Sequence, residues 1–265
     1  MARTIVTLTT DFGNTDHFVG VMKGVILKLN PEADIVDISH EVRPYDILDG
    51  AYTIAQSYRY FPPRTVHVVV VDPGVGTQRR PLLASTDQWF IAPDNGVLSL
   101  MYAREPDHLV RHITSDHFFL NPISQTFQGR DIFAAVAGWL SRGVEAGKFG
   151  EFVTDYVRFA APKPKVLSDK LVKGVVLKVD RFGNLITNLT PEDLPQLFQE
   201  NPPAFKFVVG QKEITKLNLA YAQSAPNEVF VILGSSGYLE LATNRGSAAR
   251  ILGADRGAEV GVMFG

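Results

Sequence analysis

The sequence TVHVVVVDPGVGTQRRP, residues 65–81, determines the architecture expected for the whole chain. Its first half, Val66 to Val71, is an unbroken and mostly β-branched apolar run. Such a run is typical of a strand that is buried on both faces, as in a parallel sheet. The run stops at Asp72, which is therefore expected at the carboxyl end of a central strand. Open α/β sheets bind their ligands at that end.

The loop after this strand combines glycines with a cation. Gly74 and Gly76 allow a sharp turn and a close approach of the backbone to a ligand. Arg79 follows Asp72 closely enough to fold back over the same place. An acid, a glycine loop and a guanidinium at one strand end predict a reaction centre. The alternative is a structural turn tied by an Asp–Arg pair, since ion-pair networks also gather charges.

Composition limits the classes of protein to consider. The chain has 265 residues, a formal net charge of −2 and no cysteine. It is long enough for one large domain or two modest ones. The chain lacks the basic excess that would favour nucleic-acid binding. Because it has no cysteine, disulfides and thiolate metal sites are excluded. The N-terminus lacks a signal-peptide core, and no apolar run approaches the roughly 20 residues that span a bilayer. We therefore expect a cytoplasmic soluble protein.

Residues 1–163 show strands alternating with helices. The apolar periodicities predict strands over 4–10, 34–38, 66–71, 82–85, 89–92 and 109–113, and helices over 16–29, 46–60, 97–102 and 126–140. The initial strand–helix–strand–helix–strand order indicates a mostly parallel sheet with flanking helices, an α/β fold class.

The pattern changes at residues 161–165, a stiff and polar Ala-Pro-Lys-Pro-Lys stretch that predicts a domain boundary. Beyond it, short strands are expected over 173–180, 185–189, 204–209, 229–233, 238–242 and 260–264, with a helix only over 191–199. This predicts a smaller, mostly β domain over residues 164–265, either a barrel or a sandwich.

Three acids directly follow apolar strands, and glycines come soon after each of them: Asp11, Asp72 and Asp180. A carboxylate accepts several hydrogen bonds at once, which suits ribose hydroxyls or an ammonium group. A single such acid is more often the cap of its own turn. Three together favour a polar ligand.

Other motifs are less specific. The Gly74–Gly76 loop matches neither the P-loop nor the dinucleotide fingerprint, and the six histidines show no metal-ligand spacing with paired acids. His67 lies inside the buried run and is expected to be a core residue. Ser235 and Ser236 suit a carboxylate but fit an ordinary hairpin turn better. The ring of Tyr45 either stacks on a base or packs partly buried.

Six motifs lie in a fixed order along nearly the whole chain: TTDFG, VDPGVGTxRR, PDNG, TFxGRD, DRFGN and SxGYLELAxN. Together they resemble the S-adenosyl-L-methionine (SAM) hydroxide adenosyltransferases, relatives of the fluorinases and chlorinases. The resemblance implies an N-terminal α/β domain, a C-terminal β-barrel domain and a homotrimer. The substrate would lie between the N-domain of one subunit and the C-domain of its neighbour. SAM and water would give adenosine and L-methionine, without a cofactor or a metal.

The resemblance also implies roles for individual residues. Asp11 would hold the ribose hydroxyls and Tyr45 would pack near the adenosyl group. Asp180 would take the methionine ammonium. The other implied substrate-binding residues are Gly129 in the TFxGRD motif, Phe182 and Asn184 along the adenine, Ser235 and Ser236 at the methionine carboxylate, and Thr243, Asn244 and Arg245 at the adenine edge.

One position departs from the family. In its Asp–Arg–His catalytic set, Asp72 and Arg79 match the first two members, but Gln128 stands where the family has His. A Gln donates and accepts hydrogen bonds but cannot take a proton at neutral pH. Gln128 would orient water without acting as a base. The halogenases have an uncharged pocket where Asp72 stands, so Asp72 argues against halide as the nucleophile.

Three functions remain open at this stage. A SAM hydrolase is the leading hypothesis. A SAM- or adenosine-binding protein silenced by Gln128 is the second. A phosphate-ligand enzyme that uses the Gly74–Gly76 loop ranks far lower, because the Walker lysine and a hydroxyl-bearing metal ligand are missing.

Overall fold

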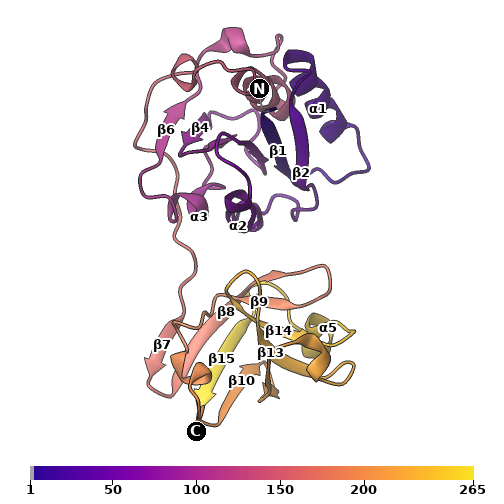
Figure 1. The fold of residues 1–265 in the computed structure, drawn as a ribbon, viewed down its shortest axis with the longest axis vertical. Coiled ribbons are helices and arrows are strands. Elements are labelled where there is room, and N and C mark those ends of the chain that lie inside the picture. Colours follow the sequence, from indigo (N-terminus) through magenta and orange to yellow (C-terminus); the bar gives the residue numbers. More distant parts are fainter. Residues whose placement is uncertain (1–2) are drawn as a thin grey trace. The chain divides into compact units, whose positions relative to one another are not determined.

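A computed structural model describes residues 3–265 and separates into two units, Met1–Ala160 and Ala161–Gly265. The first unit is built on a six-stranded sheet of order β2-β1-β3-β5-β4-β6 (Figure 1). Its strands are β1 Ile5–Thr10, β2 Asp34–Ser39, β3 Val66–Val70, β4 Pro81–Ser85, β5 Trp89–Pro93 and β6 Leu109–His112. Strands β2, β1, β3 and β5 are parallel neighbours, whereas β4 pairs antiparallel with β5 and β6. The predicted mostly parallel sheet is confirmed.

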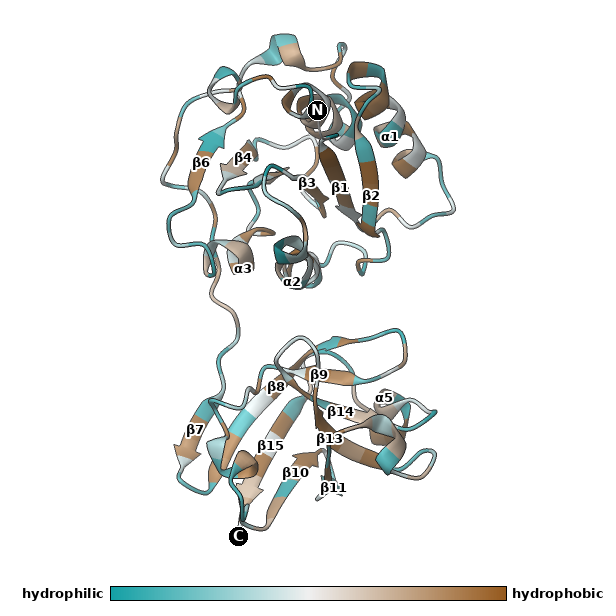
Figure 2. Ribbon diagram, viewed as in Figure 1, coloured by the Kyte–Doolittle hydropathy of each residue, from teal (hydrophilic) through white to brown (hydrophobic). Residues whose placement is uncertain are grey.

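Strand β3 lies in the middle of this sheet with every residue buried. Its side chains alternate between two cores, as the pleat requires. Val68 and Val70 pack in the core that also contains residues of α1 (Phe18–Leu29) and α4 (Ala135–Ser141). Val69 packs in the core shared with α2 (Ile47–Ser57) and α3 (Ser99–Tyr102). The helices therefore cover both faces, and Figure 2 shows β1 and β3 as hydrophobic strands between them.

Two helices follow the local signals closely. In α2 the Asp46 side chain accepts the Asp49 N–H at 3.0 Å, a helix N-cap. In α1 the chain leaves the helix at Asn30, directly before Pro31. The predicted helix over residues 126–140 differs from the structure, because it begins as a π-helix, Gly129–Ala134, before α4. Short 3₁₀ turns lie at Tyr58–Tyr60, Asp116–Phe118 and Ala146–Lys148.

The second unit is one curled, mostly antiparallel sheet of order β11-β10-β15-β8-β9-β14-β13-β12, with β7 beside β8. Its strands are β7 Lys165–Ser168, β8 Leu171–Val179, β9 Leu185–Thr187, β10 Phe205–Val209, β11 Lys212–Ile214, β12 Leu217–Asn218, β13 Val229–Leu233, β14 Leu239–Thr243 and β15 Glu259–Phe264. The long strand β8 pairs with both β15 and β9 and so joins the two halves of the sheet around one apolar core. This confirms the second, mostly β part of the predicted fold class.

Two local predictions in this unit are corrected. The helix predicted over residues 191–199 is wrong, and only a 3₁₀ turn at Pro195–Phe198 is present. Pro195 lacks an N–H and pushes Leu194 out of the helical region, to φ −132° and ψ 55°. A helix that was not predicted, α5 Ala248–Leu252, is capped by the Ser247 side chain and ends at the left-handed Gly253. Across residues 3–265, none of the helices has the length and apolarity that crossing a membrane requires.

Candidate active site

Two carboxylates of the first unit lie at the carboxyl edge of its parallel strands. Asp11 directly follows β1, and Asp72 follows β3, the next strand in the sheet. The pKa of Asp11 is raised, mainly because the carboxyl is partly buried, with a further contribution from the negative charge of Asp72. The backbone N–H of Tyr45 donates to Asp11 Oδ2 at 2.8 Å and opposes that rise. The predicted meeting of Asp11 and Asp72 at one sheet edge is therefore present.

Tyr45 adopts an unusual backbone conformation at this edge. Its φ is +65°, in the left-handed region that non-glycine residues seldom adopt. Its side chain is not packed, since the residue is 74% exposed. The alternative of a partly buried packing ring is therefore wrong. Strained residues of this kind gather at ligand sites, and here the strain brings the Tyr45 amide to Asp11.

Asp72 and Arg79 form a buried ion pair. The Arg79 Nε donates to both carboxylate oxygens at 2.8 Å, and Nη2 donates to Oδ2. Their side chains are 4% and 8% exposed, respectively. The guanidinium also lies over the ring of Phe133, 5.3 Å from its centroid. Arg79 therefore folds back over Asp72 as the sequence predicts. Its Nη1 group takes no part in these bonds.

The glycine loop between them is fixed by a neighbouring segment. Gly76 has φ +78°, and a Cβ at this position would lie 2.3 Å from the carbonyl oxygen of Gln125. Only glycine fits both the conformation and the approach. Within the loop, the Thr77 hydroxyl donates to the Gly74 carbonyl at 2.7 Å. The loop is thus held by backbone contacts as well as by the ion pair.

Gln128 precedes the π-helix in the segment that touches this loop. The residue is 8% exposed, and Gly129 packs against Phe12 and Met22. Gln125 contacts Gly76 before Gln128, and Phe133 contacts Arg79 after it. The segment that carries Gln128 therefore meets the Asp72–Arg79 loop on both sides of position 128. π-helical turns inside helices are frequent at functional sites.

The remaining predicted residues belong to the second unit, and the first of them is Asp180 at the end of β8. Its Oδ1 accepts the N–H groups of Phe182 and Asn184 at 2.9 and 2.8 Å, and its Oδ2 accepts the Asn184 side-chain amide at 2.9 Å. This is the turn-capping role that the sequence left open. The capped loop leaves Phe182 77% exposed.

Two loops next to β14 carry the other predicted residues. Ser235 and Ser236 form the hairpin turn between β13 and β14, as their sequence favoured. The hydroxyl oxygen of Ser236 is buried without a hydrogen-bond partner, and so is that of Thr243 at the end of β14. Asn244 donates to the Ser224 carbonyl at 2.8 Å. Arg245 has φ +56°, so the chain turns sharply after the strand.

The predicted residues therefore form two groups. The first unit brings together Asp11, Tyr45, Asp72 and Arg79, with Gln128 and Gly129 on an adjoining segment; the second unit holds Asp180, Phe182, Asn184, Ser235, Ser236, Thr243, Asn244 and Arg245. Within residues 3–265, no three His, Cys, Asp or Glu side chains gather so that they could hold a metal ion.

His67 is a core residue, as expected. Its Nδ1 lies 2.7 Å from the Thr7 hydroxyl and its Nε2 lies 3.2 Å from Gln88 Oε1. Burial lowers its pKa to about 4, so the ring is neutral at physiological pH. Its ring nitrogens pair with Thr7 of β1 and with Gln88, which precedes β5, so the ring lies away from the carboxyl end of β3.

Two residues of these sites were missed from the sequence. Phe133, whose ring lies under Arg79, looks like one of several apolar residues on a helix face. Glu240 is 6% exposed on β14 beside the Ser235–Ser236 turn. The available signal was a glutamate between two leucines in a strand, which indicates alternation but not burial.

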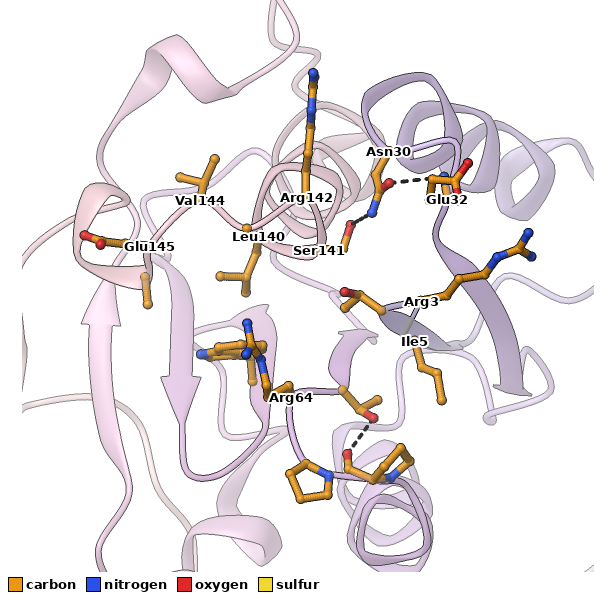
Figure 3. Close-up of a pocket in the computed structure, with 17 residues that line it drawn as sticks. Arg3, Ile5, Asn30, Glu32, Arg64, Leu140, Ser141, Arg142, Val144 and Glu145 are labelled. Atoms are coloured by element: carbon orange, nitrogen blue, oxygen red, sulfur yellow. Dashed lines mark hydrogen bonds between the residues drawn. The ribbon is translucent and has the colours of Figure 1, made fainter. Parts of the chain in front are cut away.

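A separate pocket of about 1070 Å³ lies at the opposite, amino-terminal edge of the sheet (Figure 3). Thr4 and Thr65, which precede β1 and β3, are among its lining residues. Some of its polar side chains are paired with one another or with the backbone: the Asn30 amide donates to Ser141 Oγ at 3.1 Å, and the Thr65 hydroxyl donates to the Pro62 carbonyl at 2.7 Å. Since parallel sheets bind ligands at the other edge, we place the candidate site with Asp11 and Asp72.

The chain is similar to known proteins over nearly its full length. Residues 6–150 match the family model of the SAM hydroxide adenosyltransferase N-terminal domain, and residues 174–261 match that of the C-terminal domain. The chain is 32% identical to an (R)-S-adenosyl-L-methionine hydrolase of Methanocaldococcus jannaschii, over 98% of this chain and 96% of the relative. It is 34% identical to a protein of the same name from Salinispora tropica, over 98% of each.

A solved structure is also similar over the full length. It is that of an uncharacterized conserved protein from Thermotoga maritima, with a TM-score of 0.90 and 37% identity, covering 98% of this chain and 100% of the other. The resemblance in sequence is thus matched by the fold.

Proposed function

The chain belongs to the SAM hydroxide adenosyltransferase family, and from that membership we propose that it hydrolyses S-adenosyl-L-methionine to adenosine and L-methionine. Full-length relatives are named as hydrolases of the (R) sulfonium epimer. We propose that this chain also prefers the (R) epimer.

The reaction is a displacement at the ribose 5′ carbon. A water oxygen forms the new bond to C5′ while the C5′–S bond breaks. The electron pair of the C5′–S bond goes to sulfur. The positively charged sulfonium becomes the neutral thioether of methionine, and the water loses one proton. Water is a weak nucleophile, so it must be held in line with the breaking bond and stripped of other water.

In this proposal the Asp72–Arg79 pair positions the attacking water. Arg79 stabilises developing hydroxide character, and Asp72 orients the water or accepts its proton. Gln128 adds a hydrogen bond to the water without acting as a base. The Asp11 carboxylate holds the ribose hydroxyls, with the Tyr45 ring beside the adenosyl group.

The residues of the second unit would bind the two ends of the substrate. Asp180 binds the ammonium group, and Ser235 and Ser236 bind the carboxylate of the methionine part. The adenine lies along Phe182 and Asn184, with its edge at Thr243, Asn244 and Arg245. The exposed ring of Phe182 and the unpartnered hydroxyl of Ser236 support this assignment, because the folded unit leaves the ring uncovered and gives the hydroxyl no hydrogen-bond partner.

The observation that carries the proposal is the buried Asp72–Arg79 pair at a strand end next to Asp11. The direct test is to incubate the protein with each sulfonium epimer of SAM and to measure adenosine and methionine by mass spectrometry. We expect equal amounts of both products, faster from the (R) epimer. Formation of neither product from either epimer would overturn the proposal.

A second function is favoured by one observation, the Gln at position 128. If it silences turnover, the protein binds SAM or adenosine without cleaving it. Calorimetric binding of SAM together with an absence of adenosine would support this alternative. Binding and product formation are therefore measured on the same preparation.

The quaternary arrangement is part of the same proposal. We propose a homotrimer whose sites each combine the first unit of one subunit with the second unit of its neighbour. Mixing inactive Asp72→Asn and Asp180→Ala chains after denaturation would then regenerate intact sites, about a quarter of the total under random assembly. A site formed within one chain would regain none. The cytoplasmic location and the absence of a cofactor remain predictions.

A further inference from the structure

Glu240 is a buried carboxylate that the proposed reaction does not use. It lies on β14, opposite Ile186 of β9 and Ile232 of β13, and is 6% exposed. Its neighbours on this face are apolar, including Phe230 and Ala242. Burying an ionised carboxylate among such neighbours is costly unless a cation or several donors compensate it.

The second unit supplies no such compensation. Among residues 3–265, the polar neighbour of Glu240 is the Tyr221 hydroxyl, 3.5 Å from Oε2, which is beyond the usual length of an O–H···O hydrogen bond. The groups that act on its titration are its burial, the Asp180 carboxylate and this hydroxyl, with no cation among them. The pKa of Tyr221 is raised by burial and by the same two carboxylates. Asp180, Tyr221 and Glu240 thus form one local group.

The Glu240 carboxylate lies against Gly234, the residue that precedes the two serines of the turn. A Cβ on Gly234 would lie 1.8 Å from Glu240 Oε1, so a larger residue at position 234 would displace the Glu240 side chain. The turn continues with Ser235 and Ser236, whose buried hydroxyl oxygen lacks a partner. The unpaired carboxylate and the unpaired hydroxyl therefore belong to the same β13–β14 hairpin.

Asp180 has little remaining capacity for a ligand. A carboxylate accepts about four hydrogen bonds, and three of those of Asp180 are taken by its own loop. An ammonium group has three donors to satisfy. The nearby acceptor that is still free is the carboxylate of Glu240.

We propose that Glu240 is a substrate-binding residue that, together with Asp180, binds the α-ammonium group of the methionine part of SAM. This rests on the proposed function and adds a specificity-determining residue to it. The ligand brings the positive charge that the buried carboxylate lacks, so the enzyme selects S-adenosyl sulfonium compounds that carry an amino group.

The first test is the Glu240→Gln variant, assayed for kcat and KM with SAM. Loss of a charge-assisted hydrogen bond is expected to raise KM roughly ten- to a hundredfold, with kcat changed little. The melting temperature is expected to hold or rise, because the variant removes an uncompensated buried charge. Glu228→Gln is the matched control, since Glu228 is exposed and paired with Lys216. An unchanged KM in Glu240→Gln would overturn the inference.

The second test uses the deamino analogue of SAM, in which hydrogen replaces the amino group. Glu240→Gln is expected to leave KM for this analogue nearly unchanged. An equal rise of KM for both substrates would mean that Glu240 only shapes the pocket, and it would contradict the inference.

The wild-type protein provides a test that does not depend on a variant that folds. Burial, with the Asp180 charge, raises the pKa of Glu240 to about 7. KM for SAM is therefore expected to fall as pH rises to about 7 and to rise again above about 8, where an α-amino group loses its proton. KM for the deamino analogue is expected to show neither this fall nor this rise with pH. If the wild-type protein forms no adenosine, the proposed function has failed, and the same comparisons made with Kd from calorimetry still decide the role of Glu240.

Discussion

In the proposed mechanism, the residue at position 128 affects the rate of the reaction. The family resemblance implies a His, which can accept a proton, at this position, whereas Gln128 only donates and accepts hydrogen bonds. Its buried place in a segment that touches the Asp72–Arg79 loop suits the orientation of water. We predict that Gln128→His raises kcat for SAM at least about tenfold, towards the 10²–10⁴ typical of general acid–base groups.

The control for this change is Gln125→His. It places the same ring three residues earlier, on an exposed side chain, and is expected to leave kcat unchanged. An unchanged rate in Gln128→His would show that position 128 does not participate in proton transfer.

The Asp72–Arg79 pair permits stability and catalysis to be separated. Asp72→Asn leaves the guanidinium buried without its counter-charge, which costs about 3–5 kcal/mol of folding free energy. An apolar replacement of both residues, Asp72→Leu with Arg79→Met, is often neutral in such pairs. We predict that the double variant recovers the stability lost in Asp72→Asn, by urea denaturation, but forms no adenosine. Adenosine formation by the double variant would remove the pair from the mechanism.

For single residues, prediction from the sequence succeeded where a reactive side chain lies in a short motif next to a predicted strand. Asp11, Asp72 and Arg79 lie in short motifs at strand ends, so their proximity follows from a parallel sheet. Glu240 could not be predicted, because its burial depends on the Tyr221 segment and on the turn at Gly234. The commitment of Asp180 to its own loop was one of two alternatives that only coordinates distinguish.

At the element scale, the loop of residues 72–79 depends on a glycine. Ala at position 76 would combine a left-handed φ with a Cβ 2.3 Å from the Gln125 oxygen. We predict that Gly76→Ala displaces the loop and lowers kcat by tenfold or more. The left-handed conformation should also cost about 1–2 kcal/mol of folding stability. Gly143→Ala is the control, because Gly143 has φ +102° but no atom within 4 Å of an added Cβ. Equal loss of stability with equal activity in both variants would contradict the importance of the contact.

The packing of β3 against β1 predicts a pH dependence of stability. Burial lowers the pKa of His67 to about 4, against about 6.5 in an unfolded chain. Between these values the unfolded state binds a proton that the folded state does not. The stabilisation is therefore complete above about pH 6.5 and is lost as pH falls towards 4, by up to about 3 kcal/mol.

The variant His67→Gln removes this titration while keeping a polar side chain. We predict a lower stability at pH 7 but a flatter dependence between pH 6.5 and 4, by denaturation at a series of pH values. His117→Gln, at an exposed position, is expected to retain the wild-type slope. A wild-type slope in His67→Gln would contradict this account of the core.

The helices and strands show which elements hydrophobic periodicity can predict. Apolar runs such as that of β3 and amphipathic helices such as α1 were predicted within a few residues, because burial selects their patterns. The π-helix at Gly129–Ala134 was not, since its apolar residues also fit an α-helix. The error at residues 191–199 came from giving the apolar spacing more weight than Pro195.

At the scale of the whole molecule, the sequence predicted the fold class: a mostly parallel sheet with helices on both faces, then a curled antiparallel sheet. The proposed reaction needs residues from both units, Asp11 and Asp72 from one and Asp180 and Glu240 from the other. In the proposed trimer a complete site would form through contacts between subunits, which local sequence patterns do not encode. That is why the trimer rests on family resemblance.

The central claim is that water attacks the 5′ carbon of SAM. The most direct measurement is the reaction in H₂¹⁸O, with the oxygen isotope located by mass spectrometry of the products. The account predicts one ¹⁸O in the 5′-hydroxyl of adenosine and none in methionine. Adenosine without the label, or no adenosine from a protein that binds SAM, would contradict it.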